Sequence, residues 1–385
     1  MATGIVRFGV IGVGGMGSGH CAQLPKIPEA EMTAICDTNP DTLAAAAAKY
    51  SVPGFATHEA LLDSGLVDAV IIATPHYFHP PIAVDAFARD LHVLSEKPLA
   101  VTVSAADTMI AAAKKSGRKF GVMYQMRGEG QNRAARAVIE SGRLGEIYRT
   151  SLVMGWYRSQ AYYDSGGWRA TWSGEGGGVL INQAPHYLDV FTWLGGMPKC
   201  ITGQTRTRLH EIEVEDEAFA TLEYANGAHG YLYASTTEVP NHNMLEVCGD
   251  RGKLVLHGSS LKVYEVATPI RSYTQESKEM WSSPKVEEVA VEVPAEGELK
   301  GHALITQNFA RSILYGDTLI APGEEGLNAV ELINGLILSS KSGKTVTVPV
   351  DRAEYDKLIE ELRATSQAKA RVREQRVTDP AVAAV

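Results

Sequence analysis

Residues 6–17 read VRFGVIGVGGMG, an apolar run that leads directly into the spacing G-x-G-x-x-G. The run predicts a strand over Val6–Ile11, and the glycines predict a tight turn into a helix. The first glycine permits the turn, the second lets the backbone approach a pyrophosphate, and the third allows close packing of helix on sheet. The helix start adds amide donors and a positive dipole. The predicted phosphate contacts are Gly12, Gly14, Gly15, Met16 and Gly17.

A carboxylate at the end of the second apolar run indicates which nucleotide binds. Asp37 follows Met32–Cys36, twenty residues after the last glycine of the motif. A carboxylate there binds the adenosine ribose hydroxyls and repels a 2′-phosphate, and the neighbours Thr38 and Asn39 offer no arginine to hold one. The sequence therefore predicts NAD rather than NADP. The alternative for these residues alone is a glycine turn followed by a helix-capping aspartate.

The order of elements predicts two domains. Short β-branched runs alternate with Ala-rich helical stretches over residues 5–125, a pattern typical of a doubly wound parallel sheet of the Rossmann type. After about residue 145 the pattern changes to a helix over 179–194 and then to short alternating strands between 201 and 256. We expect an NAD-binding domain over 1–126. Residues 127–385 should form an α+β substrate and oligomerisation domain with a largely antiparallel open sheet, its last helices packing back on the first domain.

Composition excludes several classes of protein. The chain has 385 residues, with 36 Lys plus Arg against 45 Asp plus Glu, and its net charge of −9 would repel a nucleic-acid backbone. No apolar run is long enough to span a membrane and the N-terminus lacks a basic leader, so we expect a cytoplasmic protein. The four cysteines form no C-x-x-C pair, which favours neither disulfides nor a metal site. The second sheet has more apolar positions than one helix layer covers, which predicts a homodimer or homotetramer.

Several further motifs occur in a fixed order. They are GVGGMG (12–17), AICD (34–37), ATPHYFH (73–79), SEKPLA (95–100), GRLGEI (142–147) and GEGGGVLINQAPHYLDVFTWLGG (174–196). On these motifs, which spread over roughly residues 5–345, the sequence resembles the Gfo/Idh/MocA family of sugar and cyclitol oxidoreductases. SEKPLA and the glycine-rich segment with its later histidine are its specific parts.

The resemblance implies three catalytic residues. In that family the lysine of E-K-P lies beside the nicotinamide and the reacting hydroxyl, its proline often follows a cis peptide, and the later histidine is the acid/base; here these are Lys97, Pro98 and His186. Asn182 stands where many members carry aspartate, and asparagine occurs in branches that oxidise C3 of sugars. The chemistry agrees, because alcohol oxidation needs a base for the O–H proton and a cation for the developing alkoxide. A helical spacing of four would place Asn182 and His186 on one face.

The remaining cofactor contacts are expected where the third, fourth and fifth strands end, the edge at which such sheets bind ligands. His76 and His79 form an H-x-x-H pair, but a loop with no third ligand does not predict zinc. The family usually has asparagine where His76 stands, whereas His79 matches a family histidine. The predicted contacts beyond the glycine loop and Asp37 are Thr74, Pro75, His79, Glu96, Lys97 and Gln125.

Residues 156–172 concentrate aromatic side chains between arginines and glycines. Flat rings cover the apolar face of a pyranose, so this segment resembles a carbohydrate-binding loop. The alternative is a packed domain junction, and its arginines could equally bind a carboxylate or phosphate. The predicted substrate contacts are Arg127, Tyr157, Arg158, Trp168, Arg169, Asn182 and His186.

The sequence thus predicts an NAD-dependent dehydrogenase that acts on a secondary hydroxyl of a sugar, glycoside or cyclitol, with C3 as a candidate carbon. An alternative is a glycoside-cleaving enzyme or lyase that oxidises C3 transiently and recycles its NAD. A second alternative is a non-catalytic NAD-binding regulatory protein.

Overall fold

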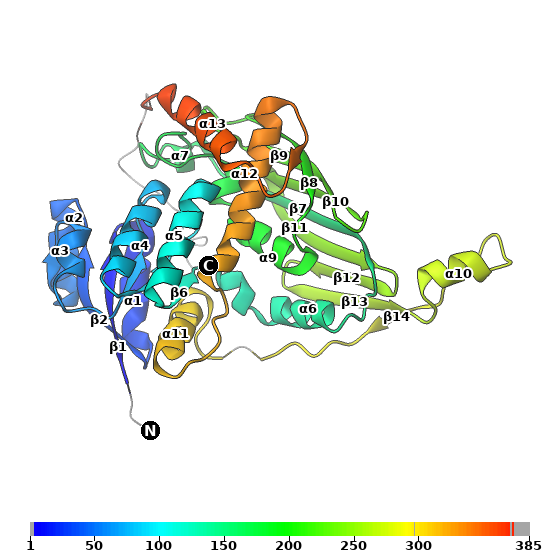
Figure 1. Cartoon of the computed structure of the whole chain (residues 1–385), viewed down its shortest axis with the longest axis horizontal. Helices are drawn as coiled ribbons and strands as arrows, with labels where there is room; N and C mark the ends of the chain where they lie inside the picture. The colour runs from blue at the N-terminus through cyan, green and yellow to red at the C-terminus, as the bar shows by residue number, and fades with distance from the viewer. Residues whose placement is uncertain (1–3, 296, 370–371, 373–385) are drawn as a thin grey trace.

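The computed structural model describes residues 4–295, 297–369 and 372. Within them, the N-terminal sheet has six parallel strands in the order β3-β2-β1-β4-β5-β6 (Figure 1). Chain order reverses direction between β1 and β4, as in a doubly wound nucleotide-binding sheet, so the predicted Rossmann fold is confirmed. The two-residue edge strand β3 is an addition to the prediction. The strands are β1 (Val6–Ile11), β2 (Ala30–Cys36), β3 (Gly54–Phe55), β4 (Ala69–Ile72), β5 (His92–Ser95) and β6 (Phe120–Val122).

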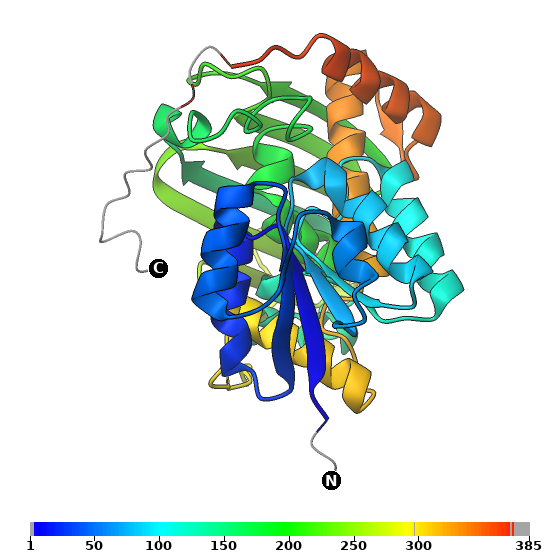
Figure 2. The same cartoon turned by 90° about the vertical axis from the view of Figure 1, so that its left-hand side faces the viewer.

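Helices cover both faces of this sheet, because its central strand β4 is apolar and buried at every position. In β4, Ala69 and Ile71 join one hydrophobic core, while Val70 and Ile72 join the other. Alternate residues of a strand point to opposite faces, so each face needs its own helices. Figure 2 shows them on the two sides. One side carries α1 (Gly15–Gln23), α2 (Pro40–Tyr50) and α11 (Gly301–Leu314); the other carries α3 (His58–Leu62), α4 (His79–Ala88) and α5 (Val103–Ser116).

The second sheet is nine-stranded in the described residues, with the order β14-β13-β12-β11-β7-β10-β9-β8-β15. Its pairs are antiparallel except that β7 and β10 run parallel. The long strand β7 lies in the middle of the sheet, between β11 and β10. Helices lie on one face of this sheet (Figure 1). The predicted largely antiparallel sheet is confirmed. The strands are β7 (Ile147–Tyr157), β8 (Cys200–Arg206), β9 (Glu217–Glu223), β10 (His229–Ser235), β11 (Thr237–Gly249), β12 (Gly252–His257), β13 (Ser260–Val266), β14 (Val286–Val289) and β15 (Val346–Thr347).

The single helix predicted over 179–194 is wrong. The structure has α8 (Val179–Asn182), a turn, and then α9 (Pro185–Gly195). Proline has no N–H to continue the helical ladder, and the amide of Ala184 instead donates to the Val179 carbonyl at 2.8 Å. The break falls between Asn182 and His186, so the argument that they share one helix face fails.

Two C-terminal helices connect the sheets. α11 packs on the first sheet, where Phe309 lies 6.3 Å from Phe8 between ring centroids. α12 (Gly326–Ser342) packs on β8 and reaches back to the start of α5, where the Asn334 side chain accepts from Val103 N and donates to Val101 O, both at 2.9 Å. None of the helices among the described residues combines the length and apolarity needed to cross a bilayer. The remaining helices are α6 (Gly130–Glu140), α7 (Gln160–Tyr163), α10 (Ile270–Glu276) and α13 (Arg352–Ala364).

Candidate active site

The glycine loop leaves open space at one position only of the three in its motif. A Cβ on Gly12, whose φ is +85°, would lie 2.8 Å from Ala73 O, and a Cβ on Gly17 would lie 1.7 Å from Gly12 O. Nothing lies within 4 Å of the Cβ position of Gly14. The fold therefore requires the outer two glycines, whereas the middle one leaves room for a ligand. Gly15 and Met16 beside it are also exposed.

Helix α1 begins at this loop without any capping side chain or first-turn acid. Its first amides have no partner inside the helix, so they present donors and a positive dipole. Asp37 borders the loop: its two carboxylate oxygens accept from Val13 N and Asn39 N, each at 2.9 Å. Such a cradle of amides next to an oriented carboxylate fits the pyrophosphate and the adenosine ribose of NAD.

The loop after β5 is fixed by a buried charge cluster. Glu96 is 4% exposed, and its Oε1 lies 2.8 Å from His20 Nε2 on α1 and 3.7 Å from His302 Nε2 on α11. Its Oε2 accepts from Lys97 N at 3.0 Å. Burial opposes ionisation, but the hydrogen bond and the charge of His20 lower the pKa of Glu96 to about 2. Glu96 therefore holds Lys97 in place as an ionised anchor, and the Lys97–Pro98 bond is cis, as the resemblance implies.

His79 joins the loops after β4 and β5. Its Nδ1 lies 2.9 Å from Pro98 O and its Nε2 lies 2.8 Å from Thr74 O. Both ring nitrogens thus face backbone carbonyls, one of which accepts the ring N–H, and this leaves the predicted cofactor contact in a supporting position. Thr74 Oγ1, by contrast, is buried without a partner and remains available for a ligand.

Lys97 links the first sheet to the segment before His186. Its Nζ donates to Asn182 O at 2.7 Å. Burial lowers the pKa of Lys97, while the carboxylates of Glu96 and Glu175 oppose that change. Two of the three predicted catalytic residues are therefore in direct contact, although Lys97 follows β5 of the first sheet and Asn182 ends α8.

His186 lies near the same ammonium. Burial, and then the charge of Lys97, lower the pKa of His186 to about 3, so its imidazole is neutral at ordinary pH. Its Nδ1 is buried without a hydrogen-bond partner, and its ring meets the Tyr124 ring edge-to-face at 6.0 Å. Tyr124 Oη and Gln125 Oε1 are also buried without partners. Buried polar atoms without hydrogen-bond partners indicate a site at which a bound ligand supplies those partners.

Glu175 is a site residue that the sequence argument missed. It is 1% exposed and accepts a hydrogen bond from the side-chain amide of Asn182. Its backbone oxygen lies 2.9 Å from His76 Nδ1. The available signal was a charged residue inside the run GEGGG, where the neighbours are otherwise small and apolar. The amide of Asn182, predicted to face substrate, is engaged by this carboxylate.

Arg127 does not lie where a substrate contact was expected. Its guanidinium is 1% exposed and makes two parallel bonds to Asp189, at 2.8 and 2.7 Å, and a third to Glu325. A buried arginine that is bound bidentately by a carboxylate has little freedom to bind a sugar. This pair instead ties the loop after β6 to helix α9, on which His186 lies.

Residues 156–169 form what we call the arginine–aromatic stack. The Arg158 guanidinium lies 5.0 Å from the Trp156 ring and 5.3 Å from the Tyr162 ring. Arg169 lies 4.7 Å from both the Tyr162 and Trp168 rings. Stacking between rings restrains both guanidinium groups. The five members are Trp156, Arg158, Tyr162, Trp168 and Arg169.

The stack ends at the candidate site. The Trp168 ring meets the His76 ring at 5.9 Å, and Arg169 Nη1 lies 3.9 Å from Glu175. Arg169 Nε is buried without a partner. Tyr157, also predicted to bind substrate, is 50% exposed beside the stack. The structure thus brings Lys97, Asn182, Trp168 and Arg169 together near His186, and it engages Arg127 with Asp189 instead.

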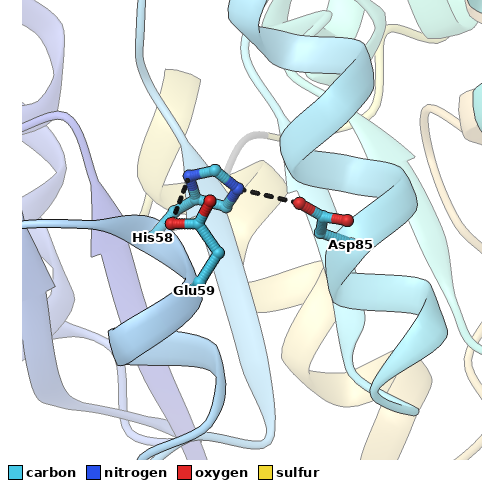
Figure 3. A group of neighbouring side chains, drawn as sticks. All are labelled: His58, Glu59 and Asp85. Atoms are coloured by element: carbon cyan, nitrogen blue, oxygen red, sulfur yellow. Dashed lines mark hydrogen bonds and ion pairs between the residues drawn. The ribbon is translucent and has the colours of Figure 1, made fainter.

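A separate cluster lies on the surface between α3 and α4. His58 Nε2 lies 2.9 Å from Asp85 and its Nδ1 lies 3.4 Å from Glu59 (Figure 3). The three could present metal-ligand atoms within 4.8 Å of one another. Because both ring nitrogens already face carboxylates, we interpret the cluster as a polar contact in which His58 on α3 is held by Asp85 on α4.

Family models match both parts of the chain. Residues 6–124 match the model described as an oxidoreductase family with an NAD-binding Rossmann fold, and residues 132–255 match the GFO/IDH/MocA C-terminal domain. The chain belongs to the Gfo/Idh/MocA oxidoreductase family. The predicted family, the NAD-binding fold and the oxidoreductase class are confirmed.

Individual relatives extend over most of this Gfo/Idh/MocA chain. The WlbA dehydrogenase of Bordetella pertussis, solved with NADH and UDP-GlcNAcA, is 29% identical with a TM-score of 0.77 over 90% of this chain and 99% of its own. The D-glucoside 3-dehydrogenase of Escherichia coli is 24% identical over 371 residues, which are 90% of this chain and 98% of that protein. An inositol 2-dehydrogenase of Arthrobacter is 37% identical over 150 residues, 38% of this chain and 44% of its own.

Proposed function

We propose that the protein oxidises a secondary hydroxyl of a sugar, glycoside or cyclitol with NAD, or reduces the corresponding ketone. The observation that carries this proposal is the 2.7 Å bond from Lys97 Nζ to Asn182 O. It joins the loop at the cofactor edge of the first sheet to the segment that precedes His186. This bond supports a site in which the Lys97 cation and the neutral imidazole of His186 act on the same alcohol, as its oxidation requires.

The residues divide the work as follows. Bound NAD supplies the hydride acceptor. The Lys97 ammonium donates a hydrogen bond to the substrate oxygen, which lowers the pKa of the hydroxyl and stabilises the developing alkoxide. The His186 imidazole accepts the O–H proton; its low pKa keeps it unprotonated but makes it a weaker base than an exposed histidine. The ammonium therefore has to supply part of the driving force.

A carbohydrate-type substrate is supported by the arginine–aromatic stack. Its rings offer flat apolar surfaces, and Arg169 Nε is a buried donor without a protein partner. The names of the relatives point the same way: one acts on C3 of glucosides and matches this chain along almost its whole length. C3 is accordingly our candidate for the reacting carbon.

A screen of sugars, glycosides and inositols for NADH fluorescence tests the proposal, with NMR of the product to locate the oxidised carbon. We expect NADH in stoichiometric amounts. Cleavage of a glycoside with only catalytic NAD would instead support transient oxidation. Tight NAD binding without turnover of any polyol would support a regulatory protein and overturn the proposal.

The expected homodimer or homotetramer and the cytoplasmic location remain predictions. In support of the first, one face of the second sheet leaves side chains such as Tyr231 exposed by 41%, while helices cover the other face. Light scattering at micromolar concentration tests this. A monomer would contradict it.

A further inference from the structure

Glu175 is a buried carboxylate in the candidate site to which the mechanism above gives no role. Its Oε2 accepts from Ala170 N at 2.5 Å and its Oε1 accepts from the Asn182 amide. Arg169 Nη1 approaches Oε1 to 3.9 Å. A fully buried carboxylate is costly unless its charge is compensated, so its presence here calls for a cationic partner.

Two carboxylates favour the charged form of the part-buried Lys97, and they differ in what else holds them. Glu96 is engaged by His20 at 2.8 Å and has His302 at 3.7 Å. The two hydrogen-bond donors to Glu175, from Ala170 and Asn182, are both neutral groups. The direct hydrogen bond of Lys97 Nζ also goes to a neutral group, the Asn182 carbonyl. The Arg169 guanidinium approaches Glu175 only to 3.9 Å, beyond hydrogen-bond distance, so the charge of Glu175 also acts on Lys97.

One residue bridges this carboxylate and the lysine. Asn182 donates its side-chain amide to Glu175 and offers its backbone oxygen to Lys97. Any movement of the Glu175 carboxylate would thus shift Asn182 and, through it, the ammonium.

We propose that Glu175 is a positioning residue for Lys97: it fixes Asn182, whose carbonyl holds the ammonium, and its negative charge keeps that ammonium protonated. The inference rests on the proposed function, in which Lys97 must carry a proton to stabilise the alkoxide. It adds to that function the residue, Glu175, that keeps the Lys97 ammonium charged.

The charges around Lys97 determine how its protonation should change with pH. Burial lowers the pKa of Lys97 and raises that of Glu175. Two carboxylates favour the protonated ammonium and two guanidinium groups oppose it, while four histidines whose own pKa values are lowered by burial complete the surroundings. These groups are Glu96, Glu175, Arg158, Arg169, His76, His79, His186 and His302. Removing the negative charge of Glu175 should release the lysine proton at lower pH.

The test is the alkaline limb of kcat/KM for the NAD-loaded enzyme. Glu175→Gln keeps the size and an acceptor oxygen but removes the charge, so we expect the limb to move to lower pH by about one unit, the low end of the effect of a nearby charge. Glu175→Asp should restore the limb in part. Glu213→Gln is the matched control: the Glu213 carboxylate lies in the same region but is engaged by Trp172 N, Ser366 and Gln367 N, so the alkaline limb of this variant should move much less.

A second readout separates failure of this inference from failure of the proposed function. Reductive ¹³C-methylation of lysines, with Lys97→Arg to assign the signal, reports the Lys97 titration by NMR without any substrate. A lower Lys97 pKa in Glu175→Gln supports the inference even if no polyol is turned over. An unmoved Lys97 titration and an unmoved limb in a folded Glu175→Gln protein would overturn it, whatever happens to kcat.

Discussion

The cofactor side and the substrate side of the candidate site use different parts of the chain: backbone amides on the first, side chains on the second. On the cofactor side, backbone amides of residues 12–17 and one carboxylate, Asp37, lie within a single β-α-β unit. On the substrate side, side chains meet across long separations, as when Lys97 reaches Asn182 85 residues later. Backbone recognition needs only a turn with space around it. Side-chain recognition needs a folded network to hold each group, as the buried Arg127–Asp189 pair beside α9 does.

The largest expected effect is on the substrate side. His186→Ala should lower kcat by roughly 10²–10⁴, because general acid–base catalysis contributes that range. Lys97→Met should also lower kcat, since the alkoxide loses its cation. NADH affinity, measured by fluorescence titration, should change little in His186→Ala, because the histidine lies on α9 beside the second sheet. A His186→Ala enzyme with nearly full turnover would remove this residue from the mechanism.

The next effect concerns the network that supports His186. Asp189→Ala would remove the carboxylate that binds the buried Arg127 guanidinium. Breaking such a buried ion pair typically costs about 3–5 kcal/mol of unfolding free energy. Urea denaturation measures this. The matched control is Asp63→Ala, which breaks the exposed pair with Arg89 and should hardly change stability. An equal loss of unfolding free energy in the two variants would show that burial does not make the Arg127–Asp189 pair more important for stability than the exposed pair.

Sequence patterns predicted the cofactor side well because its rules are local. The apolar runs, the three glycines and Asp37 each act through their immediate neighbours, and the structure has the strands, turn and helix where expected. The family motifs likewise located Lys97 beside the segment that carries His186.

The substrate side could be predicted only in part, because a charged residue's partner is chosen by tertiary packing. Arg127 follows a strand that ends at the ligand edge, yet Asp189 on α9 binds it instead. Glu175 gave no periodic signal, and its partner Asn182 is positioned by the break before Pro185. Pro185 marks that break in the sequence, because proline cannot continue the helical hydrogen-bond ladder.

On the cofactor side, a pair of glycine variants separates folding from binding. Gly14→Ala adds a methyl group into space that the protein leaves open, so we expect unchanged thermal stability and a roughly tenfold or greater rise in the Kd for NADH, about 1.4 kcal/mol per factor of ten. Gly17→Ala drives a methyl group into Gly12 O and should destabilise the fold by about 1–3 kcal/mol or more. Calorimetry and NADH titration distinguish the two. Loss of stability in Gly14→Ala would mean that the open space serves the fold.

Asp37 should control the choice of nucleotide. Replacing Asp37 with Ser and Thr38 with Arg removes the carboxylate that repels a 2′-phosphate and adds a cation to bind it. We expect the ratio of kcat/KM for NAD over NADP to fall by at least about tenfold, the scale of one charge contact. Because Asp37 also accepts from Val13 N and Asn39 N, Asp37→Asn is the control that keeps an acceptor oxygen. A wild-type enzyme that uses both nucleotides equally would contradict the role of Asp37.

The smallest effect, and the most direct test of how burial acts on the substrate side, is the acid limb of the pH–rate profile. The pKa of His186 is lowered to about 3, so the imidazole is unprotonated at pH 7 and stays so until the pH approaches that value. Because only the unprotonated ring can accept the substrate proton, kcat/KM should show no fall from His186 as the pH drops from 7 to about 5. Circular dichroism over the same range would verify that the protein stays folded. A limb with a midpoint near 6.5, the value for an unperturbed histidine, that vanishes in His186→Ala would keep the histidine as the base but show that its surroundings in the working complex are far more polar than the buried, unpartnered Nδ1 indicates.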